Sequence, residues 1–195
     1  MIKIGVLGDI GSGKSFVAKQ FGCPVFDADK EVSKIYNNDK YCYKKIKKKF
    51  PKFIKSKIIK KNELGSIIVS NKKNLKIISD IVHPIVRRRM NSFFKKNSRK
   101  KMVVLDIPLL VENKLYDKKY YLIFVESKKS EINKRLKKRA LYNKSIIKSL
   151  RKSQKSLVFK KKISNFVIKN NFKLLSLKKS IKIIKKKILD ERNSS

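Results

Sequence analysis

The sequence contains few of the residues that cross-link, bend or break a chain. Among its 195 residues there are two cysteines, four prolines, six glycines and no tryptophan. Cys23 and Cys42 have the spacing of neither a metal site nor a disulfide framework, which indicates a reducing, cytoplasmic setting. No Pro/Gly-rich linker or internal repeat divides the chain, so we expect a single domain over residues 1–195.

Long hydrophobic runs are also absent. No apolar run approaches the ~18 residues of a membrane span, and no separate apolar segment typical of a signal peptide follows the N-terminus. We therefore expect no membrane partner. Hydrophobic residues nevertheless make up 41% of the chain, which is enough for one compact domain with its own core.

Acidic residues are scarce: 54 lysines and arginines against 14 aspartates and glutamates give a net charge of +40. Such a charge is typical of nucleic-acid-binding proteins, which is one interpretation of this chain. However, the excess is nearly all lysine, is spread along the chain, and accompanies abundant Ile, Asn, Phe and Tyr, as codons rich in A and T would produce. We expect no specific nucleic-acid partner, only weak binding of polyanions at low salt and attraction of an anionic substrate.

Short apolar runs alternate with longer helical patterns. The predicted strands are 2–7, 24–27, 102–107, 120–126 and 165–169. They show little alternation and are separated by helices, which favours an α/β fold with a parallel sheet covered on both faces. The predicted helices are 15–21, 29–37, 39–50, 63–70, 72–81, 84–96, 130–141, 144–155 and a C-terminal helix with an apolar face formed by Leu174, Leu177, Ile181, Ile184 and Ile188. Pro84 suits the first turn of the helix that it begins.

The most specific motif lies between the first predicted strand and the first predicted helix. It fits the pattern G-x-x-x-x-G-K-[ST] of a phosphate-binding P-loop and consists of Gly8, Asp9, Ile10, Gly11, Ser12, Gly13, Lys14 and Ser15. The backbone N–H groups of such a loop converge on phosphate, Lys14 reaches the β- and γ-phosphates, and the Ser15 hydroxyl holds Mg²⁺. A glycine-rich turn without a ligand is the alternative, which the order strand, loop, helix disfavours. Asp9 is unexpected, because a carboxylate beside phosphates is unfavourable unless its side chain points outward.

Acidic residues follow two of the other predicted strands. Asp27 and Asp29 come after the second strand, where the ligand crevice of an open α/β sheet lies. Asp27 either serves a metal or simply ends the strand. Asp29 is the candidate base that accepts a proton from a hydroxyl, with capping of the next helix as the alternative. Asp106 ends the third strand and resembles the acid that helps to hold Mg²⁺ beside a P-loop, unless it is only a turn residue.

Arginine is much rarer than lysine in this chain. Where arginine occurs, we therefore expect its planar guanidinium group to be needed. Arg135 and Arg139 share one face of a predicted helix, where they could bind phosphate oxygens or form a solvated basic face. Arg87 and the two arginines after it could bind substrate phosphates or lie on an ordinary helix surface. His83, the only histidine, either contacts substrate or has a structural role at the start of a helix.

Together these residues resemble the dephospho-CoA kinase family over nearly the whole chain. The marks of the resemblance are the P-loop, Asp27-Ala28-Asp29, His83-Pro84, Pro108-Leu109-Leu110-Val111-Glu112-Asn113, Leu115-Tyr116, Arg135 with Arg139, and Gln154, in this order and spacing. The resemblance implies a P-loop kinase fold of the nucleotide-kinase type with a five-stranded parallel sheet. It also implies a core of about 1–29, 100–127 and 156–195, a helical acceptor-binding region of about 30–99 and a lid of about 128–155.

The resemblance further implies an activity. The γ-phosphate of ATP, with Mg²⁺, would pass to the ribose 3′-hydroxyl of dephospho-CoA, giving CoA and ADP in the last step of coenzyme A synthesis. Lys14, Asp29 and Arg139 would be catalytic, Ser15 and Asp106 would serve the metal, and the acceptor would meet Asp29, His83, Arg87, Pro108 and Leu109. A cytoplasmic monomer is expected. Another small nucleoside or nucleotide kinase is the alternative.

Three positions depart from the family pattern. Asp9 stands where a second glycine is frequent, and Ala140 follows Arg139 where the family often has aspartate. Residues 169–172, Lys-Asn-Asn-Phe, replace an Asp-Asn-x-Gly element that borders the adenine. Only Asn170 carries over from that element as a nucleotide-binding residue.

Overall fold

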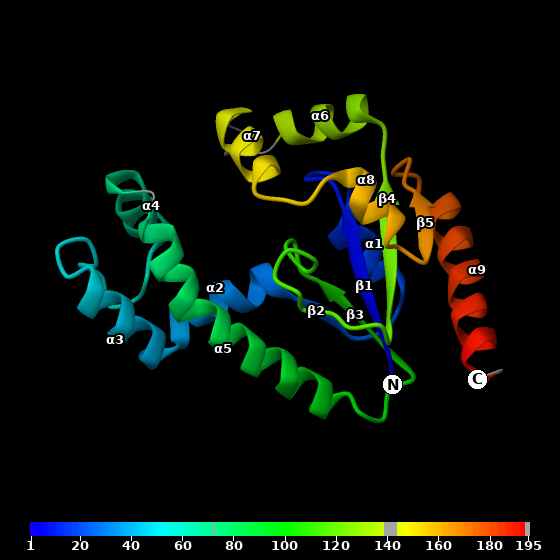
Figure 1. Cartoon of the computed structure of the whole chain (residues 1–195), viewed down its shortest axis with the longest axis horizontal. Helices are drawn as coiled ribbons and strands as arrows, with labels where there is room; N and C mark the ends of the chain where they lie inside the picture. Colours follow the sequence, from blue (N-terminus) through cyan, green and yellow to red (C-terminus); the bar gives the residue numbers. More distant parts are fainter. Residues whose placement is uncertain (72, 139–143, 194–195) are drawn as a thin grey trace. The chain divides into compact units, whose positions relative to one another are not determined.

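A computed structural model of the chain describes residues 1–71, 73–138 and 144–193. These residues form two compact units (Figure 1). One unit consists of Met1–Phe26 and Arg99–Ser195, and the other consists of Asp27–Ser98. Each unit is described by itself below.

A five-stranded sheet organises the N-terminal and C-terminal parts of the chain. Its strands are β1 (Ile2–Gly8), β2 (Val25–Asp27), β3 (Met102–Asp106), β4 (Tyr120–Glu126) and β5 (Phe166–Lys169), in the order β2-β3-β1-β4-β5. β1 pairs in parallel with β3 and β4, and β4 pairs in parallel with β5. The five predicted strands are confirmed, and so is the predicted α/β fold with a parallel sheet and flanking helices.

The core of this unit lies between the sheet and two helices, α1 (Lys14–Gln20) and α9 (Leu174–Asn193). Figure 1 shows α9 running alongside the sheet near β5. Leu177, Ile181, Ile184 and Ile188 of α9 are buried in the core, as the sequence predicted. Each buried side chain of this kind contributes roughly 1.5–3 kcal/mol. The prediction is wrong for Leu174, the first residue of the helix, which is 43% exposed and does not belong to the buried core.

Three short helices lie between β4 and β5 in the sequence: α6 (Lys129–Lys137), α7 (Lys144–Lys152) and α8 (Leu157–Lys162). Helix α8 is absent from the sequence-based prediction, because six residues are too few to show a helical period. Its start is nevertheless well defined: the Ser156 hydroxyl accepts a hydrogen bond from the Phe159 backbone N–H at 3.1 Å. Of the described helices, none is long and apolar enough to cross a bilayer.

The second unit is helical and consists of α2 (Ala28–Asn38), α3 (Lys40–Lys49), α4 (Lys61–Ser70) and α5 (Asn74–Lys96). The prediction of two helices separated before Pro84 is wrong, because α5 continues through this proline. Ile78, Val82, Ile85, Val86 and Met90 form one continuous buried stripe along α5. Their burial on both sides of Pro84 outweighs the loss of one backbone hydrogen bond. His83 and Pro84 therefore lie inside a helix rather than at its start.

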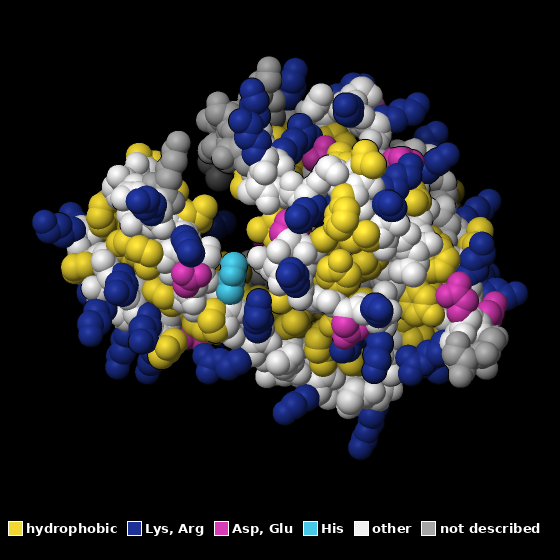
Figure 2. All heavy atoms as spheres, in the orientation of Figure 1, with side chains coloured by type: hydrophobic (Ala, Val, Ile, Leu, Met, Phe, Trp, Pro, Cys, Tyr) yellow, Lys and Arg dark blue, Asp and Glu magenta, His cyan; other side chains and the backbone are white. Residues whose placement is uncertain are grey.

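Lysine and arginine side chains are scattered over the visible face of each unit, as expected from their spread along the sequence (Figure 2).

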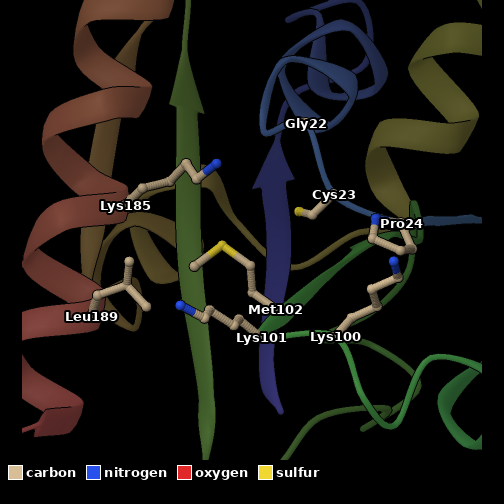
Figure 3. A pocket seen from close by; sticks show the side chains of 8 residues that line it. All are labelled: Gly22, Cys23, Pro24, Lys100, Lys101, Met102, Lys185 and Leu189. Atoms are coloured by element: carbon tan, nitrogen blue, oxygen red, sulfur yellow. The ribbon is translucent and has the colours of Figure 1, made fainter.

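A hollow of about 530 Å³ lies at the start of β3 and is lined by Gly22, Cys23, Pro24, Lys100, Lys101, Met102, Lys185 and Leu189 (Figure 3). Cys23 and Cys42 are both free. Burial raises the pKa of the Cys23 thiol, and the charge of Lys185 offsets this only in part. This shift favours the protonated thiol over the thiolate.

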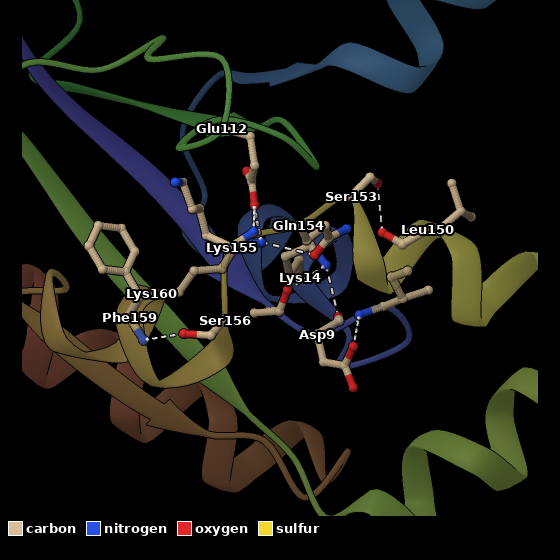
Figure 4. Close-up of polar contacts among 12 residues, drawn as sticks. Asp9, Lys14, Glu112, Leu150, Ser153, Gln154, Lys155, Ser156, Phe159 and Lys160 are labelled. Carbon is tan, nitrogen blue, oxygen red and sulfur yellow. Dashed lines mark hydrogen bonds and ion pairs between the residues drawn. The ribbon is translucent and has the colours of Figure 1, made fainter. Parts of the chain in front are cut away.

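A buried ion pair ties α8 to the loop that follows β3. The Lys160 ammonium lies 2.9 Å from Glu112 Oε1 and donates to Gln154 Oε1, also at 2.9 Å (Figure 4). The Lys160 side chain is 2% exposed and the Glu112 side chain 11%. Glu112 also accepts a hydrogen bond from the Lys155 backbone N–H at 2.8 Å. Glu112 and Gln154, two marks of the family resemblance, thus act together to anchor the segment between α7 and α8.

We expect Lys160→Met to destabilise the fold by about 3–5 kcal/mol, because it leaves the Glu112 carboxylate buried without its cation. The matched control is Lys161→Met. Lys161 pairs with Glu126, but the two side chains are 49% and 37% exposed, so its loss should cost no more than about 1 kcal/mol. Urea unfolding of both variants measures the difference. Equal, small losses would contradict an anchoring role for the buried pair.

Candidate functional site

The loop between β1 and α1 has the backbone conformation that a phosphate cradle needs. Gly11 and Gly13 adopt positive φ angles of 86° and 89°, which L-amino acids with a side chain rarely do. A Cβ atom on Gly13 would also lie 2.5 Å from the Asn170 amide nitrogen and 3.0 Å from the Phe172 ring. Both backbone conformation and space therefore require glycine at this position, and the loop can turn successive N–H groups toward one concavity.

The carboxyl ends of β4 and β5 hold the loop in place. The Ser12 carbonyl accepts a hydrogen bond from the Ser127 hydroxyl and another from the Asn170 side-chain amide, each at 2.9 Å. Asn170 is itself buried, and its backbone N–H donates to the Glu126 carbonyl at 2.8 Å. The sequence indicated Asn170 as a nucleotide-binding residue, and the structure places it beneath the phosphate-binding loop. Ser127 carried no signal in the sequence.

Lys14 begins α1, and its side chain folds back across the loop. The ammonium donates to the Asp9 carbonyl at 2.9 Å and to the Gly8 carbonyl at 3.3 Å (Figure 4). Its positive charge thus lies within the loop itself. Ser15 follows in the first turn of α1 and is exposed, so its hydroxyl is accessible to a ligand.

Asp9 is almost buried, and its carboxylate is fully engaged. Oδ1 accepts from the Ile10 backbone N–H at 2.7 Å and from Arg151 Nε at 3.0 Å, and Oδ2 accepts from Arg151 Nη2 at 2.8 Å. Arg151 lies in the last turn of α7 and was not among the predicted site residues. A signal did exist, because the chain has only eight arginines against 46 lysines. The unexpected acid in the loop is thus paired with a residue 142 positions away.

The two predicted lid arginines have different outcomes. The Arg135 guanidinium lies over the Phe172 ring, with its central carbon 4.2 Å from the ring centroid. The pair is a cation–π contact at the end of β5 rather than a purely solvated charge. Phe172 has a positive φ of 62°, consistent with the glycine that the family has at this position. Arg139 lies outside the described residues.

The acids at the ends of β2 and β3 have distinct positions. Asp27 ends β2 and caps α2, since its Oδ1 accepts from the Lys30 backbone N–H at 3.0 Å. The alternative in which Asp29 caps this helix is therefore wrong: Asp29 is exposed in the first turn. Asp106 is buried at the carboxyl end of β3. Because β3 is the neighbour of β1, Asp106 and the phosphate-binding loop lie at the same edge of the sheet.

The predicted acceptor residues fall in both units. His83 and Arg87 are exposed on α5, as is Arg88. Arg89 instead lies 3.4 Å from Glu31 and 3.7 Å from Asp39, so it stabilises the helical unit. Pro108 and Leu109, both partly exposed, directly follow β3 in the sheet-containing unit. The carboxyl edge of the sheet thus gathers the phosphate-binding loop, Asp106, Pro108, Leu109 and Asn170.

The chain matches known proteins over most of its length. The family model described as dephospho-CoA kinase matches residues 2–176. A dephospho-CoA kinase of Wolbachia pipientis wMel is 34% identical over 170 residues, covering 85% of this chain and 87% of that protein. One of Ehrlichia canis (strain Jake) is 32% identical over 199 residues, covering 99% and 98%. The crystal structure of TT1252 from Thermus thermophilus matches with a TM-score of 0.77 at 27% identity, covering 95% of this chain and 97% of that one.

The extent of these matches agrees with the geometry of the phosphate-binding loop and with the five-stranded parallel sheet that supports it. The chain therefore belongs to the dephospho-CoA kinase family, whose members are ATP-dependent kinases.

Proposed function

We propose that this chain phosphorylates the ribose 3′-hydroxyl of dephospho-CoA with ATP, giving CoA and ADP. The observation that carries the proposal is the family match over residues 2–176, which begins just before an anchored phosphate-binding loop with Lys14 folded into it. The alternative of a basic nucleic-acid-binding protein would leave this loop without a use. The alternative of another small-molecule kinase is disfavoured, because the family model that matches the chain is that of dephospho-CoA kinase.

The chemistry follows from the residues of the loop. The 3′-oxygen forms a bond to the γ-phosphorus while the bond from that phosphorus to the bridging oxygen of ADP breaks. Charge on the transferring group would be stabilised by the loop N–H groups, by Lys14 and, as the family resemblance implies, by Arg139. Asp29 would accept the proton of the 3′-hydroxyl. Its exposed position in the first turn of α2 leaves the carboxylate accessible to an acceptor molecule.

The residues present fit Mg²⁺ in the manner of P-loop kinases. The Ser15 hydroxyl is exposed at the start of α1, and Asp106 lies at the same edge of the sheet. Within the described residues no cluster of three His, Cys, Asp or Glu side chains forms a separate metal cage. This arrangement suits Mg²⁺, which usually binds through a few protein oxygens, water and substrate phosphates. Bound there, Mg²⁺ would neutralise charge on the β- and γ-phosphates.

The remaining assignments concern the acceptor and the setting. We propose that His83 and Arg87 on α5, and Pro108 and Leu109 after β3, contact dephospho-CoA. The Asp-Asn-x-Gly element of the family survives here only as Asn170, which we assign to the nucleotide side of the site. A cytoplasmic monomer with no specific nucleic-acid partner is the simplest setting for this activity.

Purified protein should form ADP only when ATP, Mg²⁺ and dephospho-CoA are all present. The three components should be omitted in turn, and adenosine, AMP and shikimate should replace dephospho-CoA in parallel reactions. Coupled detection of ADP measures each rate. Comparable rates with another acceptor would show that the acceptor assignment is wrong while leaving the kinase assignment intact.

Lys14→Ala should lower the turnover by about 10²–10³, because it removes a positive charge from the transferring phosphoryl group. Lys19→Ala is the matched control, since Lys19 is an exposed lysine in the last turn of the same helix. Steady-state rates and circular dichroism should be measured for both variants. Near-normal turnover of a folded Lys14→Ala protein would contradict the proposed role of the loop.

Asp29→Asn should lower kcat by about 10²–10⁴ with little change in the affinity for either substrate, because the amide cannot accept the proton. Thermal melting of the variant separates a loss of catalysis from a loss of fold, and the helix cap itself is kept, since Asp27 and not Asp29 caps α2. The matched control is Asp27→Asn, which keeps a capping oxygen. If kcat falls for Asp27→Asn and not for Asp29→Asn, the base is Asp27.

A further inference from the structure

Asp9 places a carboxylate inside a loop that must receive polyphosphate. Its side chain is 12% exposed, so water screens it poorly. At an effective dielectric constant of about 20, an unpaired negative charge about 6–10 Å from a bound phosphate would weaken its binding roughly 10- to 100-fold. The overall charge of +40 does not remove this penalty, because exposed lysines more than about 8 Å away are screened at physiological salt. Compensation has to come from a cation in direct contact.

Arg151 supplies that contact. Its Nε and Nη2 atoms donate to the two carboxylate oxygens of Asp9 at 3.0 and 2.8 Å, the bidentate geometry in which arginine pairs most strongly with a carboxylate. The Ile10 backbone N–H donates to the same carboxylate, so Asp9 is held from both sides. Lysine could match the charge of Arg151 but not both hydrogen bonds.

The residues around the Asp9–Arg151 pair show how Arg151 is held beside the loop. A hollow of about 390 Å³ lies beside Asp9 and Arg151, and its other lining residues are Lys129, Asn133, Gln154, Lys155, Ser156 and Leu157. Gln154 and Lys155 belong to the segment that the buried Lys160–Glu112 pair anchors. Arg151 therefore approaches the loop from a fixed support rather than from a free chain end.

We propose that Arg151 is a positioning residue for nucleotide binding that acts through Asp9. It neutralises the carboxylate inside the phosphate-binding loop and joins α7 to that loop, so that the loop accepts ATP. The inference rests on the proposed kinase function only in requiring ATP as the nucleotide. It predicts that removal of the Asp9 charge restores the ATP affinity that is lost when Arg151 is removed.

The test is equilibrium binding of Mg-ATP, without acceptor, to the full-length chain and its variants at fixed ionic strength. Arg151→Gln should weaken binding about 10- to 100-fold, because the Asp9 charge is then uncompensated. Asp9→Asn alone, which removes the carboxylate charge and keeps the loop backbone, should bind ATP more tightly than Arg151→Gln. The double variant should regain most of the lost affinity. Arg151→Lys, which keeps the charge, should bind ATP much more tightly than Arg151→Gln.

The controls separate this role from a general loss of structure. Lys152→Gln removes the next, exposed cation of α7 and should change ATP affinity less than threefold. Thermal melting of each variant tests whether it is folded under the binding conditions. Binding by a variant that is unfolded at 25 °C is measured at 10 °C, after melting has confirmed that it is folded there.

Each other outcome overturns the inference. A double variant as weak as Arg151→Gln would show that Arg151 acts on the nucleotide directly. Unchanged affinity for Arg151→Gln would show that the ion pair has no role in binding. Weak binding by Arg151→Lys would rule out charge neutralisation. If the unsubstituted protein binds no ATP, the proposed function fails and the inference with it. If the unsubstituted protein binds ATP but the double variant does not regain the affinity lost in Arg151→Gln, the inference is overturned and the proposed function is not.

Discussion

Two hydrogen bonds to the Ser12 carbonyl oxygen, from Ser127 and Asn170, fix the phosphate-binding loop to the ends of β4 and β5. The rest of the site depends on this attachment. It brings the Asn170 amide so close to Gly13 that no side chain fits there, and it leaves the loop in the conformation that lets Lys14 reach the Gly8 and Asp9 carbonyls. The parallel sheet therefore does more than support the loop. The strand order β1-β4-β5 places the carboxyl ends of β4 and β5 within reach of the loop that follows β1.

The extreme charge of the chain contributes little to this architecture. Several of its few acids instead form specific contacts, each with a particular cation. Glu112 is buried with Lys160, Glu31 pairs with Arg89, and Asp9 pairs with Arg151. Most lysines, by contrast, are scattered on the surface, where a single charge has a small effect on stability (Figure 2). This distribution agrees with a composition set by codon bias, in which a few specific ion pairs contribute to the structure and the net charge does not.

The elements that the sequence predicted well are those governed by local pattern. The strands and the phosphate-binding loop follow from apolar runs and from a glycine spacing, both of which lie within a few residues. The errors arise where distant residues decide. Pro84 should have begun a helix, but the stripe from Ile78 to Met90 packs on both sides of it. Nothing near Arg151 in the sequence reveals its partner Asp9, although the scarcity of arginine, which indicated Arg135, Arg139 and residues 87–89, applies equally to Arg151.

Acceptor identity is the central claim of this account, and the position of the transferred phosphate tests it most directly. Phosphorus and proton NMR of a complete reaction of ATP, Mg²⁺ and dephospho-CoA identifies the carbon to which a new phosphomonoester is attached. The account predicts one new phosphomonoester coupled to the hydrogen on the ribose 3′-carbon, formed in equal amount with ADP. A phosphate on the 2′-oxygen, or ADP accompanied only by inorganic phosphate, would contradict it.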